Sequence, residues 1–219
     1  MPTDPPLPSP SHPPTPQAPM GPAGPDAAAA RGARVFVGVG GGIAVYKVCT
    51  LVSRLAQAGA QVTVAMTPAA TRFVTPLTFQ ALSARPVYTS PWEHIESQDP
   101  QHIALARSCD LAIVAPATMD LLASLAHGVT RDVVCLILSA IDRRLTPVLL
   151  APSMNEVMWS QPATRRNVAQ LEADGFTVLG PATGWQACRA VGPGRLPEPE
   201  DLLAAVCDRL AQRRSGAQA

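Results

Sequence analysis

Aromatic and charged residues are scarce in this chain, and each shortage excludes a class of function. Aromatic residues make up 4% of the 219 residues, too few for a platform on which the bases of a single strand could stack. Charged residues make up 15% and leave a net charge of +1, so the basic excess of nucleic-acid-binding proteins is missing. No apolar run approaches the ~20 residues that a membrane-spanning helix needs. We therefore expect neither a nucleic-acid partner nor a membrane partner.

The chain also lacks a Cys-x-x-Cys pair, and its start lacks the marks of a signal peptide. The five cysteines are odd in number and widely spread: Cys49, Cys109, Cys135, Cys188 and Cys207. We therefore expect no structural metal site and expect free thiols, as in a reducing compartment. The first residues show no basic stretch followed by a long apolar core. These features predict a cytoplasmic protein.

Proline is abundant, but it is concentrated at the N-terminus. Eleven of the 24 prolines precede Ala27. A segment so rich in proline and small residues cannot bury enough apolar surface to fold. We expect residues 1–32 to form a disordered or polyproline II tail, and residues 33–219 to form one globular domain.

Short apolar segments alternate with helical ones after this tail. Strands are predicted at 34–39, 61–66, 110–115, 146–151 and 176–179, and helices at 44–57, 67–75, 76–84, 118–127, 131–140, 161–174 and 200–212. The polar segment 85–101 and the Gly/Pro-rich segment 180–199 are expected to be loops. This alternation predicts an α/β fold, a three-layer Rossmann-like or flavodoxin-like sandwich with a parallel sheet.

A glycine-rich turn, Gly-Val-Gly-Gly-Gly-Ile at residues 38–43, follows the first predicted strand. Glycines let the backbone approach a phosphate, and the N-terminus of the next helix offers N–H groups to it. The dinucleotide fingerprint is incomplete, because Ile43 stands where its last glycine would be. The second strand ends in Met66 and Thr67, with no acidic residue for a ribose. The pattern favours a mononucleotide over NAD, and a glycine turn without a ligand stays the alternative.

Polar groups also end the next predicted strands. Thr67 follows the second strand, and Pro116, Ala117 and Thr118 follow the third. Each could be an ordinary helix cap. Because the carboxyl ends of parallel strands meet at one edge of a sheet, we expect these groups to converge on the glycine turn. Together they are typical of a cradle for a phosphate and a ring.

The fourth predicted strand leads into Pro-Ser-Met-Asn-Glu-Val-Met-Trp at residues 152–159. The proline ends the ladder of the sheet, and Asn155 stands just beyond the strand, with two methionines and a tryptophan as apolar walls. Asn155 is therefore either a substrate ligand at the carboxyl edge of the sheet or the N-cap of a following helix.

Six pieces of the sequence together resemble a known family. They are residues 41–47 (Gly-Gly-Ile-Ala-Val-Tyr-Lys), His102, residues 115–120 (Ala-Pro-Ala-Thr-Met-Asp), residues 152–159, residues 186–188 (Gln-Ala-Cys) and residues 192–195 (Gly-Pro-Gly-Arg). In order and spacing they resemble the flavin-containing cysteine decarboxylases, most of all the phosphopantothenoylcysteine decarboxylases of coenzyme A biosynthesis. The resemblance runs from about Val35 to the C-terminal helix, and the N-terminal tail has no counterpart in the family.

The resemblance implies an FMN-dependent decarboxylase that converts 4'-phosphopantothenoylcysteine, a small thiol acid, to 4'-phosphopantetheine. In this family the flavin oxidises the carbon that bears the thiol, which provides an acceptor for the electrons left when CO₂ departs. The cofactor residues implied are Gly41, Gly42, Ile43, Thr67, Phe73, Ala115, Pro116, Ala117, Thr118 and Met154.

The resemblance also implies three catalytic residues. His102 would assist deprotonation of the substrate thiol, Asn155 would hold the carboxylate or amide, and Cys188 would donate the proton of the reductive half-reaction. Arg131 and Met158 join Asn155 as expected substrate contacts. The family builds its flavin site between subunits, with the histidine contributed across the interface. We therefore expect self-association into a trimer or a multiple of a trimer.

Three positions depart from the family's pattern. Gly42 stands where a serine is usual, Arg131 where an asparagine contacts the substrate carboxylate, and Arg189 where a glycine follows the cysteine. Arg131 could grip a carboxylate through two hydrogen bonds, or it could point to solvent. Two alternatives therefore stay open: a flavoprotein decarboxylase that acts on another cysteine-type substrate, and a non-catalytic flavin-binding regulator.

Overall fold

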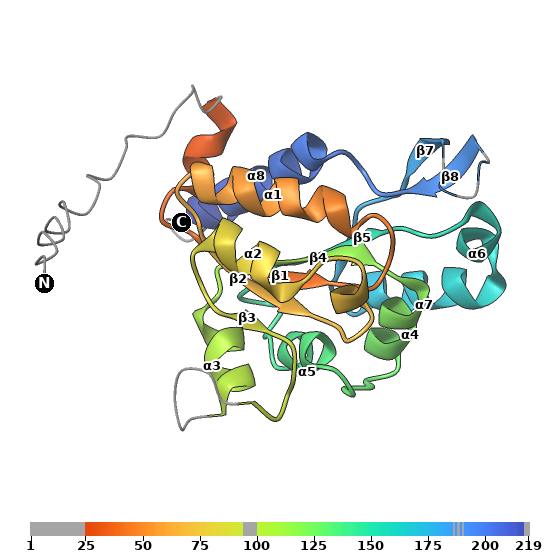
Figure 1. Cartoon of the computed structure of the whole chain (residues 1–219), viewed down its shortest axis with the longest axis horizontal. Helices are drawn as coiled ribbons and strands as arrows, with labels where there is room; N and C mark the ends of the chain where they lie inside the picture. The colour runs from red at the N-terminus through yellow and green to blue at the C-terminus, as the bar shows by residue number, and fades with distance from the viewer. Residues whose placement is uncertain (1–24, 94–99, 186, 188, 190, 217–219) are drawn as a thin grey trace, which may run out of the picture.

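A six-stranded parallel sheet forms the centre of the structure, a computed structural model that describes residues 25–93, 100–185, 187, 189 and 191–216 (Figure 1). The strands follow one another across the sheet as β3 (Val87–Tyr88), β2 (Gln61–Met66), β1 (Arg34–Val39), β4 (Leu111–Ala117), β5 (Val148–Pro152) and β6 (Thr177–Val178). This order is that of the Rossmann fold. The predicted parallel α/β fold is confirmed. A separate antiparallel hairpin consists of β7 (Ala182–Trp185) and β8 (Val191–Arg195).

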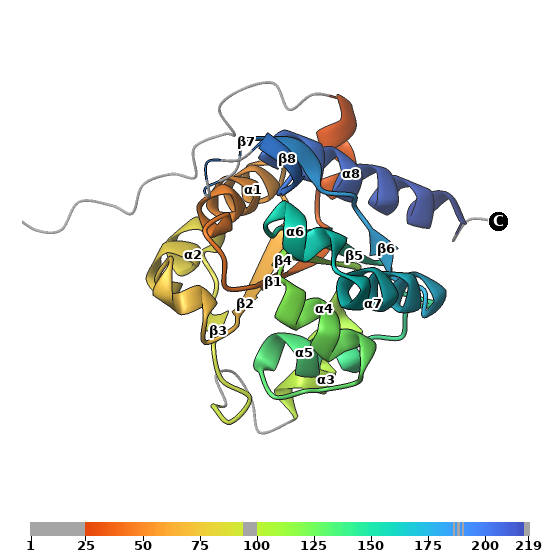
Figure 2. The same cartoon turned by 90° about the vertical axis from the view of Figure 1, so that its right-hand side faces the viewer.

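Helices cover both faces of the sheet, which gives the predicted three layers (Figures 1 and 2). One face carries α1 (Val45–Gln57), α2 (Pro76–Ser83) and α8 (Pro199–Gly216). The other carries α3 (Gln101–Ser108), α4 (Met119–Ala126), α5 (Val133–Ser139) and α7 (Pro162–Ala173), with the short α6 (Glu156–Ser160) before α7. Within the described ranges, no helix has the length and apolar character that a membrane crossing needs.

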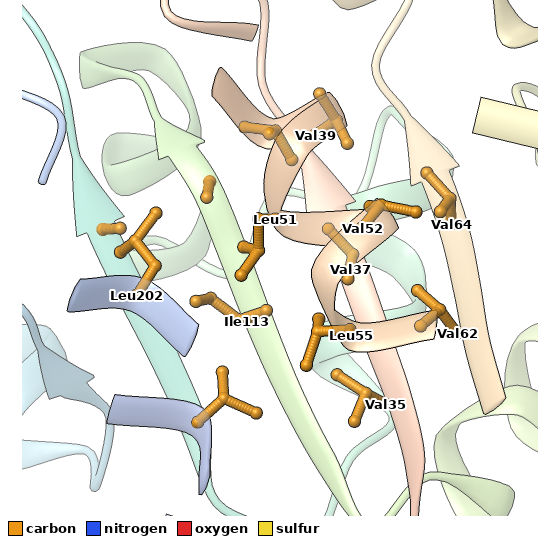
Figure 3. Close-up of a cluster of buried hydrophobic side chains, with 14 of the residues drawn as sticks. Val35, Val37, Val39, Leu51, Val52, Leu55, Val62, Val64, Ile113 and Leu202 are labelled. Carbon is orange, nitrogen blue, oxygen red and sulfur yellow. The ribbon is translucent and has the colours of Figure 1, made fainter. Parts of the chain in front are cut away.

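The pleat of β1 explains how the two cores form. Alternate residues of a strand point to opposite faces, so Val35, Val37 and Val39 pack under α1, as Figure 3 shows. Phe36 points into the core on the other side. Gly38 also faces that side, and a Cβ there would stand 2.7 Å from Cγ1 of Val134. Glycine at this position therefore lets α5 approach the sheet closely.

The structure corrects four of the predicted boundaries. Residues 25–30 form a 3-10 helix that packs against α8, with Ala30 fully buried, so order begins before residue 33. The segment after β2 holds a 3-10 helix at Ala70–Arg72 in place of an α-helix. The expected loop 85–101 contains β3 and leads into α3, and the expected loop 180–199 contains β7 and β8. The predicted tail residues 1–24 lie outside the described residues.

Candidate functional site

A cleft of about 520 Å³ opens at the carboxyl edge of the sheet. It lies between the start of α1, the end of β5 and the hairpin of β7 and β8, on the side that faces the viewer in Figure 2. This is the edge at which open α/β sheets bind ligands. The lining is mainly apolar, with two cationic side chains, and consists of Gly42, Ile43, Ala44, Tyr46, Lys47, Ser153, Met154, Asn155, Trp185, Ala187, Gly194, Arg195 and Leu196.

The glycine turn is held tightly between two other segments. A Cβ on Gly41 would lie 2.7 Å from the carbonyl carbon of Ala69, in the segment after β2. A Cβ on Gly40 would meet the carbonyl oxygen of Pro116 and lie 2.7 Å from Cδ1 of Leu121. The structure thus brings together the ends of β1, β2 and β4, as the strand order predicts.

Gly42, unlike Gly40 and Gly41, has space around it. The nearest atoms to a Cβ at this position would be Cγ of Pro116 at 3.8 Å and Cγ2 of Thr118 at 3.9 Å. These are ordinary van der Waals distances. The serine that is usual in the family would therefore fit here, and its absence is not dictated by packing.

The two threonines of the predicted cradle lie beside the turn and act as local caps. Thr67 is buried, and its Oγ1 accepts a hydrogen bond from the Ala70 N–H at 3.2 Å. Oγ1 of Thr118 accepts from the Leu121 N–H at 3.3 Å and caps α4. Because each hydroxyl oxygen acts here as an acceptor, its hydrogen is available as a donor to a phosphate or ring.

Asn155 is the N-cap that its sequence position allowed, and it also lies at the cleft. Its Oδ1 accepts a hydrogen bond from the Val157 N–H at 2.8 Å, so it is the N-cap of α6. The residue also lines the cleft. Next to it, the Met154 N–H donates to the Gly194 carbonyl at 2.9 Å and ties the end of β5 to the hairpin. The cap fixes the orientation in which Asn155 would meet a ligand.

A buried lysine and an arginine give the cleft its positive charge. The Lys47 side chain is 9% exposed, and its Nζ donates to the Leu196 carbonyl at 3.3 Å and to Oε1 of Glu198 at 3.1 Å. Arg195 forms an ion pair with the same carboxylate. The hydrogen bond from Lys47, outweighing the smaller effect of burial, holds the pKa of Glu198 below its ordinary value. One carboxylate between two cations leaves a net positive charge beside the cleft.

Our sequence analysis assigned no role to Lys47, Arg195 or Glu198. A signal was present for the first, because Lys47 belongs to the apolar face of a predicted helix, next to Val48. A charged residue on such a face is usually paired when it is buried. The partner, 151 residues further along the chain, has no comparable signal.

Other predicted site residues lie away from this cleft. His102 is half-buried on α3, and Arg131 is exposed directly before Asp132, the N-cap of α5. Helices α3 and α5 pack against each other, and both figures place α3 on the opposite side of the molecule from the hairpin. Phe73 is 50% and Met158 42% exposed, and neither lines the cleft.

The predicted catalytic cysteine, Cys188, lies outside the described residues. Its neighbour Ala187 lines the cleft. Arg189 has a φ of 65°, in the left-handed region that favours glycine. The cysteine decarboxylases have glycine at this position. Here an arginine adopts a backbone conformation that favours glycine.

Comparisons with known proteins decide the family. The family described as Flavoprotein matches residues 25–211. The chain belongs to the flavoprotein family. This flavoprotein is also 44% identical over 181 residues to the coenzyme A biosynthesis bifunctional protein CoaBC of Vibrio vulnificus. The match covers 83% of the chain and 44% of the relative, so the chain spans less than half the length of the curated relative.

Two solved structures are similar to this chain over nearly the whole length of their own chains. A cysteine-to-serine mutant of PPC decarboxylase, complexed with pantothenoylaminoethenethiol, has a TM-score of 0.73 at 27% identity and covers 80% of this flavoprotein and 97% of that chain. SpaF, an FMN-dependent cysteine decarboxylase, has a TM-score of 0.72 at 27% identity and covers 84% and 99%. The predicted resemblance to the flavin-containing cysteine decarboxylases is confirmed.

Proposed function

We propose that this flavoprotein binds FMN and decarboxylates 4'-phosphopantothenoylcysteine to 4'-phosphopantetheine. The observation that carries the proposal is the cleft at the carboxyl edge of the sheet, which joins the glycine turn, Asn155 and two cations in one apolar cavity. The substrate has two anionic groups and a stem of methyl, methylene and amide groups, so its chemistry complements the cations, Asn155 and the apolar lining. The name of the Vibrio vulnificus relative and the ligand of the PPC decarboxylase structure support the same substrate.

The glycine turn and its neighbours have the donor groups that FMN requires. Gly40 and Gly41 pack against Pro116 and Ala69, whereas Gly42 has open space and lines the cleft, so a phosphate could approach the backbone of the turn at Gly42. The hydroxyls of Thr67 and Thr118 flank the turn, and Ile43 and Met154 are apolar neighbours suited to a ring. Bound FMN would supply an electron acceptor, which protein side chains lack.

The cleft residues would orient the substrate in this proposal. Lys47 and Arg195 attract its anionic groups into an apolar cavity, where charges act more strongly than in water. Asn155, held by the N-cap hydrogen bond, meets the substrate amide or carboxylate in one orientation. The apolar walls at Tyr46 and Trp185 exclude water from the departing carboxylate.

The position of His102 supports a site completed by a second copy of the chain. It lies on α3, on the far side of the molecule from the cleft, and Arg131 lies beside the neighbouring α5. A catalytic role for His102 thus needs the α3 face of one subunit to meet the cleft of another. We propose a homo-oligomer, a trimer or a multiple of one. The exposed apolar side chains Ile43, Tyr46 and Trp185 around the cleft suit such an interface.

We place the activity in the cytoplasm. The four cysteines in the described part of the chain, Cys49, Cys109, Cys135 and Cys207, are free thiols. A reducing compartment maintains thiols in this state.

A decarboxylase for a peptide that ends in cysteine is the second candidate. The similarity to SpaF, which nearly equals that to PPC decarboxylase, favours it. The two candidates differ in charge, because only the pantothenoyl substrate brings a phosphate to Lys47 and Arg195. A non-catalytic regulator would bind FMN and turn over neither compound.

Release of CO₂ from three compounds separates these functions. The FMN-loaded chain is mixed with phosphopantothenoylcysteine, with its unphosphorylated form, and with a peptide that ends in cysteine, and products are identified by mass spectrometry. We expect the phosphorylated compound to react with the lowest KM. Replacement of Lys47 by methionine should raise that KM about tenfold and leave the KM for the unphosphorylated compound unchanged. Turnover of the peptide alone would refute the proposed substrate, and no turnover of any compound would support the regulator.

A further inference from the structure

A second cleft, of about 320 Å³, lies at the opposite, amino edge of the sheet. Its walls are the loop before β5, the loop before β6 and the last turns of α8, an element that Figure 1 labels. Four arginines line it: Arg143, Arg144, Arg209 and Arg213. No acidic residue stands among its lining residues in the described part of the chain. We call this cleft the arginine groove.

Among the described residues, two of these arginines form an ion pair with a carboxylate. Arg144 pairs with Asp142 at 2.7 Å, and Arg213 pairs with Asp110 at 2.9 Å. Asp110 is shared, because it also accepts hydrogen bonds from the backbone and side chain of Arg34. The carboxylates beside the groove are therefore outnumbered by guanidinium groups.

The other two arginines are held by neutral groups. Nε of Arg143 donates to the Asp174 carbonyl at 2.8 Å, and its guanidinium lies over the Phe176 ring, 4.4 Å from the centroid. Arg209 donates to Oγ1 of Thr177 at 2.7 Å and to the Gln212 side chain at 3.0 Å. These contacts fix the two side chains in place. The Asp142 carboxylate, which Arg143 also attracts, is already paired with Arg144.

The end of α8 does not by itself explain this arrangement. Basic residues in the last turn stabilise a helix C-terminus, which accounts for arginines on α8 alone. Arg143 and Arg144 come from the loop between α5 and β5 and face the same groove. Bringing like charges together in this way lowers stability unless an anion joins them.

We propose that the arginine groove binds a small ligand that carries a diphosphate group. Guanidinium groups bind phosphate oxygens through paired hydrogen bonds, and two phosphates can engage arginines from both walls. Thr177 and Gln212 add neutral polar groups, and Leu145 and Pro147 add an apolar wall on which an attached organic group can rest. The groove and the catalytic cleft lie at opposite edges of the sheet, so both ligands can bind at once.

Calorimetric titration of the full chain, saturated with FMN, tests the proposal. The probes are inorganic pyrophosphate, orthophosphate and adenosine diphosphate. We expect pyrophosphate to bind once per chain, more tightly than orthophosphate, and to bind less tightly as salt is raised. Tighter binding of the nucleotide would identify an organic diphosphate as the ligand, and equal binding would identify the diphosphate group alone as what the groove recognises.

Two arginine substitutions test whether the probe binds in the arginine groove. Arg144 is 88% exposed, so Arg144→Gln removes a charge from the groove without disturbing the core, and we expect it to weaken pyrophosphate binding about tenfold. Arg166→Gln is the matched control, because Arg166 is an exposed arginine on α7 that does not line the groove. It should leave the affinity unchanged.

Three results would overturn the proposal. The first is no saturable pyrophosphate binding in the millimolar range. The second is equal loss of affinity in Arg144→Gln and Arg166→Gln. The third is loss of affinity in Lys47→Met together with full affinity in Arg144→Gln, which would place the probe in the catalytic cleft. Binding of an acidic polypeptide to the same arginines, without pyrophosphate binding, would instead make the groove a protein-docking surface.

Discussion

Substitution of Gly41 by alanine tests whether the glycine turn holds the flavin. The added Cβ would lie 2.7 Å from the carbonyl carbon and 3.0 Å from the Cα of Ala69, and it would lie nearer still to the Cβ of Ala69. An ordinary contact begins at 3.4 Å. The turn and the segment after β2 would therefore have to separate by more than about 0.7 Å, the difference between 3.4 and 2.7 Å, because the Cβ of Ala69 is nearer than 2.7 Å.

This separation affects both stability and flavin affinity. The atoms in conflict belong to backbone and Cβ, so no flexible side chain can move away, and overpacking of this kind costs about 1–3 kcal/mol. The displaced segment carries Thr67, whose hydroxyl lies beside the turn. We expect the dissociation constant for FMN to rise about tenfold, which corresponds to about 1.4 kcal/mol.

The matched control is Gly42→Ser at the adjacent position. A Cβ on Gly42 would have no atom nearer than 3.8 Å, so this change should leave the fold intact. Its hydroxyl adds a donor at the turn, and we expect equal or tighter FMN binding. Flavin absorbance per chain after dialysis, titration with FMN and thermal unfolding measure both variants.

Two results would refute this account of the glycine turn. If Gly41→Ala keeps the wild-type flavin content and melting temperature, the turn tolerates the separation and does not contact the flavin phosphate. If both variants lose flavin equally while staying folded, the damage comes from the turn as a whole and not from the contact with Ala69.

Four further predictions concern other parts of the chain. Burial alone would raise the pKa of Asp110, but hydrogen bonds from Arg34 and Arg213 outweigh it and hold the pKa at about 2. The stabilisation from this carboxylate is therefore complete above its unfolded pKa and is lost as the pH falls from about 4 to about 2. Asp110→Asn should lower the free energy of unfolding by about 2 kcal/mol at pH 7 and by almost nothing below pH ~2. Urea titrations at the two pH values measure this difference. His102→Asn should retain flavin but lose turnover, and full turnover would show that the thiol is deprotonated by another group. Arg131→Asn should weaken substrate binding and speed CO₂ release, since less ground-state stabilisation must be undone; unchanged kinetics would mean that this exposed side chain never meets substrate. Arg189→Gly should be more stable than Arg189→Ala by about 1 kcal/mol, because φ is 65° there, and the opposite order would indicate an ordinary backbone at this position.

The long strands β1, β2, β4 and β5, most of the helices and the place of the ligand edge were determined by the sequence alone. The residues of β1, β4 and β5 are almost all buried, and such continuous apolar segments are recognisable without knowledge of their partners. The glycine turn was equally clear from its three consecutive glycines, although the contacts that require glycine at 40 and 41 come from the distant residues Pro116 and Ala69. Both the apolar strands and the glycine turn can be recognised from the order of residues along the chain.

Elements that depend on distant partners were missed. Strand β3 has two residues, and it is held by parallel pairing with β2 and by burial of Tyr88 in the core. The hairpin of β7 and β8 is rich in glycine and proline, and it is held by the bond from Met154 to Gly194 and by the approach of Glu156 to Gly192. Neither element has an apolar alternation of its own, so the local pattern predicted loops.

Only the tertiary structure decided how charge is distributed. Lys47 and Glu198 are 151 residues apart in sequence and meet beside the cleft at the carboxyl edge, while Arg143 and Arg209 meet at the opposite edge of the sheet. The net charge and the spacing of charged residues along the sequence do not depend on which residues meet in the fold. The sequence therefore could not predict these pairings. The strands and the glycine turn can be recognised from neighbouring residues in the sequence. The partners of each charged side chain depend on which distant segments the folded sheet brings together.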